Sequence, residues 1–398
     1  MSALSGRRIV LGVSGSIAAY KAVQLASDLV KAGALVDTVL TAGALKFVQP
    51  LSFRAITHRL VAHDLWDPTH PTGVIHVDLA VAADALLVAP ATANTIARLA
   101  LGLADDLLGC VALSTPAPIL IAPAMESRMF EHPATQANLA SLRDRGVRII
   151  DPGVGHLASG ATGVGRMAEP SVILGNLAAT LGTDGDLVGC HIVVTAGGTR
   201  EPIDPVRFLT NRSSGKQGYA IAAAARDRGA RVTLISSADL PAPISVTVVP
   251  VATAEQMLNA VQEASANCDA LIMAAAVADY RVAKAASEKI KKSGASLRID
   301  LVQNPDILAT VRGPFVRVGF AAETEHLLDH AAAKLRAKDL DLIVANDVSA
   351  ADAGFGVDTN RVTLLSPVGA EELPLLSKSD VADRVLDRVA ALIAERRA

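Results

Sequence analysis

The sequence predicts an α/β protein made of two Rossmann-like domains. Two segments, Arg8–Ala18 and His191–Thr199, each place an apolar, β-branched run directly before a turn of small residues. A helix is expected after each turn, and its N-terminus and backbone N–H groups would face an anion, most readily a phosphate. Strand-length apolar runs alternate with helical patterns in both halves, which indicates parallel sheets covered on both faces. The 398 residues also exceed what one hydrophobic core usually supports.

The first half is expected to form one parallel sheet. Residues Ile17–Lys31 show a helical pattern, with Gly33 just past the end. The apolar stripe of this helix consists of Val23, Ala26, Leu29 and Val30. The strands are predicted at Arg8–Val13, Leu35–Leu40, Ala85–Ala89, Ile119–Ala122 and Val147–Ile150. Ligands of such sheets bind beyond the carboxyl ends of the strands. Those ends are followed by Ser14–Ser16, Thr41, Pro90–Asn94 and Pro123–Glu126.

A polar, glycine-rich stretch, Thr183–Gly189, precedes the second half. We place the domain boundary near residue 189, which gives domains 1–189 and 190–398. Strands of the second domain are expected at Ile192–Ala196, Val232–Ser236, Ala270–Ala275, Arg317–Phe320, Leu340–Ala345 and Arg361–Leu365. Residues Asp380–Arg397 have the pattern of a closing helix.

Composition excludes several classes of protein. The net charge of −3 argues against a nucleic-acid surface or a polybasic membrane patch. Cys110, Cys190 and Cys268 lie far apart, which gives neither metal-ligand spacing nor a disulfide framework. The longest apolar run, Ala270–Ala278, is too short to span a bilayer, and the N-terminus lacks a signal-peptide pattern. We therefore expect a soluble, cytoplasmic protein that acts on small molecules.

The glycine turns do not match known nucleotide fingerprints. Neither contains G-x-G-x-x-G or a P-loop, and no acidic residue stands at the end of the second strand of either half, at Leu40–Ala42 or Ser236–Ser237. A nicotinamide dehydrogenase is therefore disfavoured. The turns alone leave open whether they bind phosphate or only connect strand and helix tightly.

An ordered set of motifs in the first half carries a family resemblance. The set comprises Gly12–Lys21, Ile75–Leu79 around His76, Pro90–Thr95 and Ala122–Met129. It resembles the flavin-containing cysteine decarboxylases, among them the phosphopantothenoylcysteine decarboxylases, over roughly residues 6–170. The resemblance implies a flavodoxin-like domain that binds FMN. The cofactor would supply the redox chemistry, and the protein would supply orientation and protons.

The resemblance implies a role for each motif residue. The FMN-binding residues would be Gly12, Ser14, Gly15, Ser16 and Thr41 around the phosphate and Thr92, Ala93 and Asn94 near the ring system. Hydroxyl groups and backbone amides can hold a phosphate without a cation. Asn94 could equally cap a helix, and both roles are compatible. His76 would be the catalytic histidine, since imidazole can hold a proton beside a carboxylate at neutral pH.

Two positions depart from the family pattern. The family commonly has Pro-Ala-Met-Asn where this chain has Glu126, and the substrate site is expected to include Glu126 and Met129. A carboxylate there would repel the substrate carboxylate unless it is protonated, turned away or bridged by water. The family flap commonly carries a cysteine where this chain has Ser159. A hydroxyl is a weaker acid than a thiol, so Ser159 would act as a proton relay from water.

The second half carries another ordered set of motifs. They are Thr195–Phe208, Thr210–Lys216, Ala274–Tyr280, Lys289–Lys292, Asn304–Ile307, Gly319–Thr324 and Ala345–Asp347. The set resembles the CTP-using bacterial phosphopantothenate–cysteine ligases from about residue 190 onward. The resemblance implies that a carboxylate is activated as an acyl-cytidylate before the amide forms.

Roles in the ligase half follow from that resemblance. Asn211 would orient the acyl-cytidylate, and Lys289 would neutralise triphosphate charge, although a run such as Lys289–Lys292 is also typical of a solvated loop. Asp279 would hold Mg²⁺ or a ribose hydroxyl. Lys334 and Lys338 lie four apart on an expected helix and can both face phosphates. The remaining CTP-binding residues would be Ala275, Ala276, Pro305, Asp306, Ile307, Leu308 and Phe320.

Together the two resemblances predict a bifunctional enzyme of coenzyme A biosynthesis. Its substrates would be 4′-phosphopantothenate, L-cysteine and CTP, with FMN and Mg²⁺ as cofactors and with neither nucleic acid nor membrane as a partner. The resemblance also implies a dodecamer built from decarboxylase trimers and ligase dimers. Glu126 and Ser159 motivate one alternative, a CTP-dependent ligase fused to a silent, flavin-binding regulatory domain.

Overall fold

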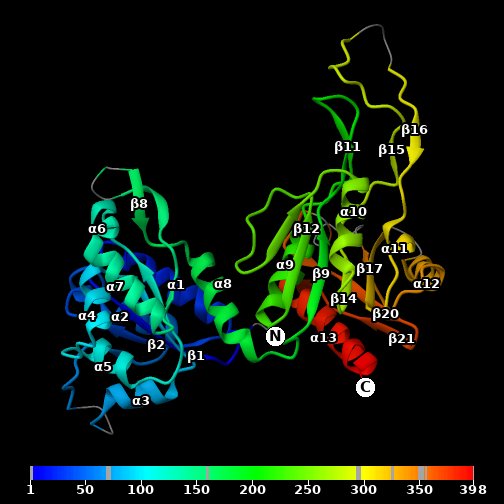
Figure 1. Cartoon of the computed structure of the whole chain (residues 1–398). Helices are drawn as coiled ribbons and strands as arrows, with labels where there is room; N and C mark the ends of the chain where they lie inside the picture. The colour runs from blue at the N-terminus through cyan, green and yellow to red at the C-terminus, as the bar shows by residue number, and fades with distance from the viewer. Residues whose placement is uncertain are drawn as a thin grey trace. The chain divides into compact units, whose positions relative to one another are not determined.

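The chain folds into two compact units, Ser2–Leu181 and Gly182–Ala398. The division falls just before the polar stretch Thr183–Gly189. The computed structural model, drawn in Figure 1, describes residues 3–68, 73–157, 160, 162–292, 297–323, 327–347, 354 and 356–397. No helix within these ranges is long and apolar enough to cross a membrane.

The first unit contains a six-stranded parallel sheet in the order β3-β2-β1-β4-β5-β6. Without the two-residue edge strand β3, this is the flavodoxin order, which confirms the predicted doubly wound domain. The strands are β1 (Arg8–Val13), β2 (Leu35–Leu40), β3 (Val61–Ala62), β4 (Ala85–Ala91), β5 (Ile119–Pro123) and β6 (Arg148–Ile149). A separate hairpin consists of β7 (Gly153–His156) and β8 (Thr162–Arg166).

Helices cover both faces of this sheet. Ile9 and Leu11 of β1 enter the core with α1 and α8, whereas Val10 enters the opposite core with α3, α4, α5 and α7. This alternation is expected of a strand buried on both sides. The helices are α1 (Ala19–Lys31), α2 (Pro50–Thr57), α3 (Ile75–Ala82), α4 (Ala93–Leu101), α5 (Leu107–Ser114), α6 (Ser127–Glu131), α7 (Pro133–Asp144) and α8 (Pro170–Leu181), with a 3₁₀ turn η1 at Ala44–Lys46.

The buried stripe of α1 differs slightly from the predicted one. Ala22, Leu25, Ala26 and Leu29 are buried, whereas the predicted Val23 and Val30 are only partly covered. Small alanines let α1 lie close to the sheet, so the stripe centres on them rather than on the flanking valines.

The second unit contains an eight-stranded sheet in the order β13-β12-β9-β14-β17-β18-β20-β21. Its first six strands are parallel, and β20 and β21 are antiparallel. These strands are β9 (His191–Ala196), β12 (Arg231–Ser236), β13 (Thr247–Pro250), β14 (Ala270–Met273), β17 (Val316–Glu323), β18 (Leu342–Asp347), β20 (Val362–Ser366) and β21 (Gly369–Glu372). A short antiparallel pair, β19 (Thr359–Asn360) and β22 (Leu376–Ser377), lies outside this sheet.

Helices again cover both faces. One face packs under α9 and α13, and the other packs under α10, α11 and α12. The helices are α9 (Lys216–Asp227), α10 (Ala254–Ser265), α11 (Ile307–Thr310), α12 (Leu327–Ala337) and α13 (Lys378–Arg397), with a 3₁₀ turn η2 at Gly182–Asp184.

The predicted strand–turn–helix opening of the second half is wrong in one respect. After Thr199 the chain forms a hairpin of β10 (Arg200–Pro202) and β11 (Phe208–Thr210), and α9 begins only at Lys216. Pro202 ends β10 and Pro205 lies in the hairpin tip, and both favour a turn over a continuing helix. A second ribbon, β15 (Tyr280–Val282) and β16 (Leu301–Gln303), contacts the hairpin and extends beside it from the sheet (Figure 1).

Candidate functional site

In the first unit, a buried serine joins the carboxyl ends of β1 and β4. The Ser14 hydroxyl donates to the Pro90 carbonyl at 2.8 Å and accepts the Thr92 N–H at 3.0 Å. Ser14 is 1% exposed, so its side chain holds the two loops together. This is the switch point of the sheet, where the strand order reverses and ligands of doubly wound folds bind.

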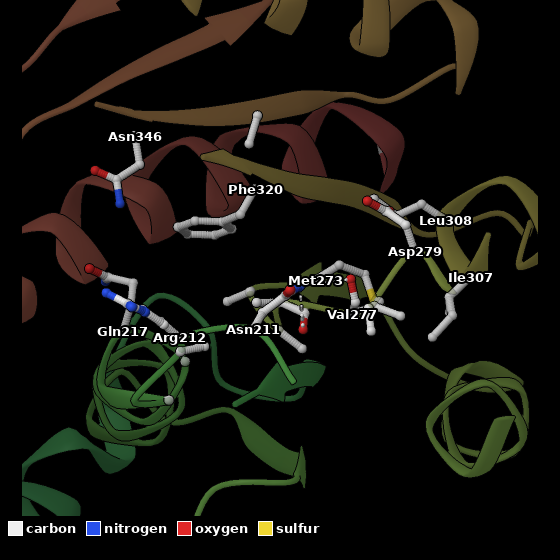
Figure 2. Close-up of a pocket in the computed structure, with 18 of the residues that line it drawn as sticks. Asn211, Arg212, Gln217, Met273, Val277, Asp279, Ile307, Leu308, Phe320 and Asn346 are labelled. Atoms are coloured by element: carbon white, nitrogen blue, oxygen red, sulfur yellow. Dashed lines mark hydrogen bonds between the residues drawn. The ribbon is translucent and has the colours of Figure 1, made fainter. Parts of the chain in front are cut away.

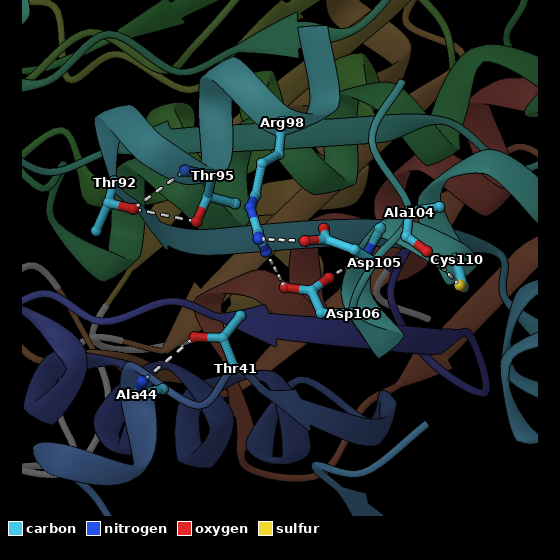
Figure 3. Close-up of polar contacts among 10 residues, drawn as sticks. Thr41, Ala44, Thr92, Thr95, Arg98, Ala104, Asp105, Asp106 and Cys110 are labelled. Atoms are coloured by element: carbon cyan, nitrogen blue, oxygen red, sulfur yellow. Dashed lines mark hydrogen bonds and ion pairs between the residues drawn. The ribbon is translucent and has the colours of Figure 1, made fainter. Parts of the chain in front are cut away.

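The loop after β2 reaches the same point. A Cβ atom added to Gly15 would lie 2.7 Å from the Gly43 carbonyl carbon, so only glycine allows the two loops to approach this closely. Thr41 starts the second loop, and its Oγ1 accepts the Ala44 N–H at 3.2 Å (Figure 3). The structure therefore brings together the segments of Ser14–Ser16 and Thr41, which are predicted to hold the phosphate, and that of Thr92, which is predicted to lie near the ring system.

The first turn of α4 is capped by Thr92. Its Oγ1 accepts the Thr95 N–H at 3.2 Å (Figure 3), so the N-cap considered for Asn94 belongs to Thr92 instead. Asn94 lies in the first turn and is exposed, and Ala93 is the first residue of the helix. At the far end of α4, Arg98 pairs with Asp106 at 3.0 Å and ties the helix to the start of α5.

His76 occupies the first turn of α3 and is half-buried. Because α3 runs back toward the start of β4, its first turn lies toward the carboxyl edge of the sheet. Among the described residues no hydrogen bond joins His76 to the loops of Ser14 or Thr92.

Glu126 turns its carboxylate onto the backbone. Its Oε2 accepts the Arg128 N–H at 2.7 Å and caps α6, where Met129 is 50% exposed. The hairpin β7–β8 is anchored beside this loop, because the Met125 N–H donates to the Gly165 carbonyl at 2.9 Å. A Cβ atom on Gly165 would collide with the Met125 carbonyl. Ser159, predicted in the flap, lies outside the described residues.

In the second unit, a cavity of about 830 Å³ opens at the carboxyl ends of β14, β17 and β18. Figure 2 shows Asn211, Asp279, Leu308 and Phe320 around it. Nearly all predicted ligase residues line this cavity: Asn211, Ala275, Ala276, Asp279, Pro305, Asp306, Ile307, Leu308, Phe320, Lys334 and Lys338.

Buried hydroxyls shape the wall that follows β14. Thr195 Oγ1 accepts the Ala275 N–H at 3.1 Å, and Thr199 Oγ1 accepts the Ala278 N–H at 2.9 Å. The Asn211 amide nitrogen donates to the Val277 carbonyl at 3.2 Å. These bonds fix the backbone of the segment Ala274–Ala278, whose small side chains leave room for a ligand.

The turn that precedes α11 contributes an ion pair to the cavity lining. Lys338 Nζ lies 2.8 Å from Asp306 Oδ2, and Asp306 also caps α11 through the Ala309 N–H. Burial alone would raise the pKa of Asp306, but the Lys338 ammonium and the helix N–H groups outweigh it and hold this pKa below its usual value.

The structure does not bring Lys289 to this cavity. Lys289 is exposed on the β15–β16 ribbon and is absent from the described residues that line the cavity. No cluster of three or more His, Cys, Asp or Glu side chains that could hold a metal ion occurs within the described part of the chain.

The sequence argument missed several residues at the α9 end of the cavity. They are Lys216, Gln217, Asn346, Asn360 and Lys378. Lys378 is buried at the start of α13 and donates to the Gly354 carbonyl at 2.9 Å, and burial lowers its pKa. Lys216 pairs with Asp358 at 2.7 Å. Lys216 and Asn346 belong to two of the sequence motifs but have no predicted role, whereas no sequence signal places Lys378 here.

Comparisons with known proteins agree with this geometry. Residues 2–182 match the Flavoprotein family model, and residues 187–393 match the model of the DNA/pantothenate metabolism flavoprotein C-terminal domain. The coenzyme A biosynthesis bifunctional protein CoaBC of Haemophilus influenzae is 44% identical over 97% of this chain and 98% of its own length. That of Bacillus subtilis is 45% identical over 98% of each chain.

A solved structure covers the second half. The crystal structure of the C-terminal domain of a CoaBC protein is 40% identical to this chain and covers 53% of it and 99% of the solved chain, with a TM-score of 0.46.

The two family matches define a flavoprotein unit fused to a pantothenate-metabolism unit. The chain belongs to the family of the bifunctional CoaBC proteins of coenzyme A biosynthesis. This confirms the predicted bifunctional enzyme, with one decarboxylase and one ligase activity.

Proposed function

We propose that the second unit joins 4′-phosphopantothenate to L-cysteine with CTP, and that the first unit decarboxylates the product to 4′-phosphopantetheine with FMN. The observation that carries the ligase assignment is the cavity of about 830 Å³, which gathers motif blocks far apart in the sequence. Its volume lies within the range of small-molecule sites and leaves room for a nucleotide beside a second substrate.

The ligase step begins with activation of the carboxylate. A carboxylate oxygen of 4′-phosphopantothenate bonds to the α-phosphorus of CTP, and the bond from that phosphorus to the bridging oxygen breaks, so pyrophosphate leaves. The cysteine amine then displaces CMP and forms the amide. Asn211, held against the Val277 carbonyl, would orient the acyl-cytidylate. Lys289 lies outside the cavity in this structure and would have to approach the bound nucleotide to neutralise the charge that develops on the triphosphate.

Phe320 and the Pro305–Leu308 turn would bound the cytosine, and Lys334 and Lys338 would face the phosphates. Lys338 would have to exchange its Asp306 partner for a phosphate oxygen. Asp279 would hold Mg²⁺ together with triphosphate oxygens, or a ribose hydroxyl.

In the first unit, the residues present fit an FMN phosphate. Gly12, Ser16 and Thr41 would surround it in the cradle that the approach of Gly15 to Gly43 creates. Thr92, Ala93 and Asn94 would lie along the ring system. When bound, FMN supplies the redox chemistry that makes loss of CO₂ possible.

The protein would supply orientation and protons for that decarboxylation. His76 would hold a proton beside the substrate carboxylate. Glu126 is turned onto the α6 backbone, which reduces its repulsion of that carboxylate, and Met129 would contact the substrate. Ser159 would relay a proton from water.

The proposal includes a cytoplasmic homo-oligomer, a dodecamer of decarboxylase trimers and ligase dimers. Exposed apolar side chains on α1 and α2 and just before α1 support a subunit contact in the first unit. They are Ile17, Tyr20 and Leu51, which are 58%, 63% and 73% exposed. Such a cluster is typical of an interface.

The test follows both activities in the full chain. Purified protein should show a flavin absorption spectrum, release one pyrophosphate for each phosphopantothenoylcysteine formed from CTP, and release CO₂ from that product. Equal rates with ATP and CTP would contradict the CTP assignment. A ligase that leaves phosphopantothenoylcysteine unchanged would instead favour the alternative of a silent, flavin-binding regulatory domain, which the departures at Glu126 and Ser159 motivate.

A further inference from the structure

The tip of the β10–β11 hairpin holds the neighbouring β15–β16 ribbon at one residue. The Ile290 N–H donates to Asp204 Oδ2 at 3.1 Å, and Arg207 Nη2 donates to the Ile290 carbonyl at 2.9 Å. Earlier in the same ribbon, the Ala286 N–H donates to the Ile203 carbonyl at 2.9 Å. The backbone on both sides of Ile290 is therefore bound to a hairpin that lies 86 positions away along the chain.

The two oxygens of Asp204 have different partners. Oδ1 accepts the N–H groups of Val206 and Arg207 at 2.8 and 2.9 Å, which closes the hairpin tip. Oδ2 accepts Ile290 N–H and, at 3.0 Å, Arg207 Nε. The carboxylate is fully buried, and the Arg207 guanidinium holds the pKa of Asp204 well below its usual range. Oδ1 thus closes the hairpin tip, whereas Oδ2 binds both the Arg207 side chain of the hairpin and the backbone of the ribbon.

The other end of the ribbon is bound to the cavity. The Asn304 N–H donates to the Asp279 carbonyl, and the Asn304 side chain donates to the Ala278 carbonyl, both at 2.8 Å. Asp279 and Asn304 both line the cavity. The segment from Tyr280 to Ile290, which begins with β15, is therefore anchored at the cavity edge and again at Ile290.

Lys289 directly precedes the second anchor. Its Cα lies one peptide, about 3.8 Å, from that of Ile290, so the clamp limits where its ammonium group can reach. We propose that Asp204 is a positioning residue for the ligase reaction, because it sets the place from which Lys289 acts on the triphosphate. The inference rests on the proposed role of Lys289.

A hairpin tip alone does not require this carboxylate. The Arg207 side chain of this ion pair is 43% exposed, and ion pairs with a solvent-exposed partner add little net stability. The local turn needs only Oδ1, which an asparagine side chain also provides. The bond from the Ile290 N–H to Oδ2 is the contact that the hairpin alone does not explain.

Asp204→Asn separates the two roles. The amide oxygen can keep the bonds from the N–H groups of Val206 and Arg207. The amide nitrogen would face the Ile290 N–H and the Arg207 guanidinium, and it cannot accept a hydrogen bond from either. We expect the rate of pyrophosphate release at saturating CTP to fall roughly 10- to 100-fold, the range typical of a misplaced catalytic group. The flavin spectrum and the release of CO₂ from supplied phosphopantothenoylcysteine should stay at the parent level.

Glu288→Gln is the matched control. It removes one negative charge beside Lys289 from an exposed side chain and should keep the parent rate. An Asp204→Asn protein with the parent rate, or a Glu288→Gln protein with the same loss, would overturn the positioning role.

A double-mutant cycle distinguishes positioning from a general structural effect. If Asp204 acts through Lys289, adding Asp204→Asn to Lys289→Gln should lower the rate further by less than about twofold. Losses that multiply would overturn the inference. Should Asp204→Asn fail to fold, Ile290→Pro removes the same N–H donor from the ribbon side and replaces it in the cycle. Absence of pyrophosphate release from the parent would contradict the proposed function itself, which the first assay shows separately.

Discussion

After β1 the chain passes through Ser14–Ser16 and begins α1 at Ala19, whereas after β9 it forms a whole hairpin before α9 begins at Lys216. The two openings look alike in the sequence. In the first, Gly15 lies against Gly43 and the small residues bring loops together. In the second, the hairpin extends from the sheet and holds the ribbon that carries Lys289.

The difference concerns which groups each site offers to a phosphate. In the first unit the strand ends themselves supply hydroxyls and backbone amides, which suit a permanently held phosphate. In the second unit a basic segment is held outside the cavity by a separate element, which suits a nucleotide that must enter, react and leave as two products. We therefore expect a substitution in one unit to leave the activity of the other unit unchanged.

The largest effect is expected from His76→Asn. It removes the proposed proton carrier from the first unit, so CO₂ release should fall roughly 10²- to 10⁴-fold while FMN absorbance and the ligase rate remain. His58→Asn is the control, because asparagine tolerates the left-handed backbone of His58. A colourless His76→Asn protein would instead assign this residue to the flavin site itself.

Lys289→Gln makes the converse test. The loss of the cation that is proposed to neutralise the triphosphate should lower pyrophosphate release by roughly 10²-fold. Decarboxylation of supplied phosphopantothenoylcysteine should be unchanged. Lys284→Gln removes the same charge from an exposed position on the same ribbon and serves as the control. An unchanged pyrophosphate rate would remove Lys289 from the activation step.

Gly15→Ala tests the close approach of loops in the first unit. The added methyl group would meet the Gly43 backbone, so we expect a loss of about 1–3 kcal/mol in the stability of this unit and weaker FMN binding. Gly153→Ala is the control, since its nearest neighbour would lie at 3.8 Å. Thermal melts and FMN titration measure both effects. Normal FMN binding by Gly15→Ala would show that the cradle can widen without loss.

Mild acid should distinguish the two units by a smaller amount. Burial lowers the pKa of His191, whose ring contacts Thr233 Oγ1 and the Asn267 carbonyl. The unfolded chain then binds the proton more readily, so stability of the second unit should fall as the pH drops through about 6.5. Hydrogen exchange at β9 should rise between pH 7 and 5.5 more than exchange at β1. His191→Gln should reduce that difference, and an equal rise in both strands would contradict this explanation.

The sheets were predictable because their signals are local. Each predicted strand coincides with an observed one to within a few residues, since buried parallel strands are continuous apolar runs. Most of the predicted ligase residues line the cavity because they stand in motifs whose order resembles a known family, whereas Lys289 does not line it. The cap of α4 was assigned to the wrong side chain, because Thr92 and Asn94 can both cap and the sequence does not state where the helix begins.

Contacts between distant segments could not be predicted. The bond from Ile290 to Asp204 depends on two extended elements lying side by side, and neither has a hydrophobic period that reveals its partner. Lys378 reaches the cavity because α13 packs beside α9. It lies far in the sequence from every motif, so the sequence does not indicate this contact.

Helix α13 also has a consequence for the order in which the protein is made. It contributes Val381, Ala382, Val385, Leu386, Val389 and Ile393 to the core shared with β9 and α9. The second unit therefore lacks one side of its core until residues near 393 have left the ribosome, whereas the first unit is complete once α8 has emerged. Domains generally fold as units during synthesis, so the flavin-binding half can become compact while its partner is still open. A message cut short before residue 378 would yield a decarboxylase without a ligase.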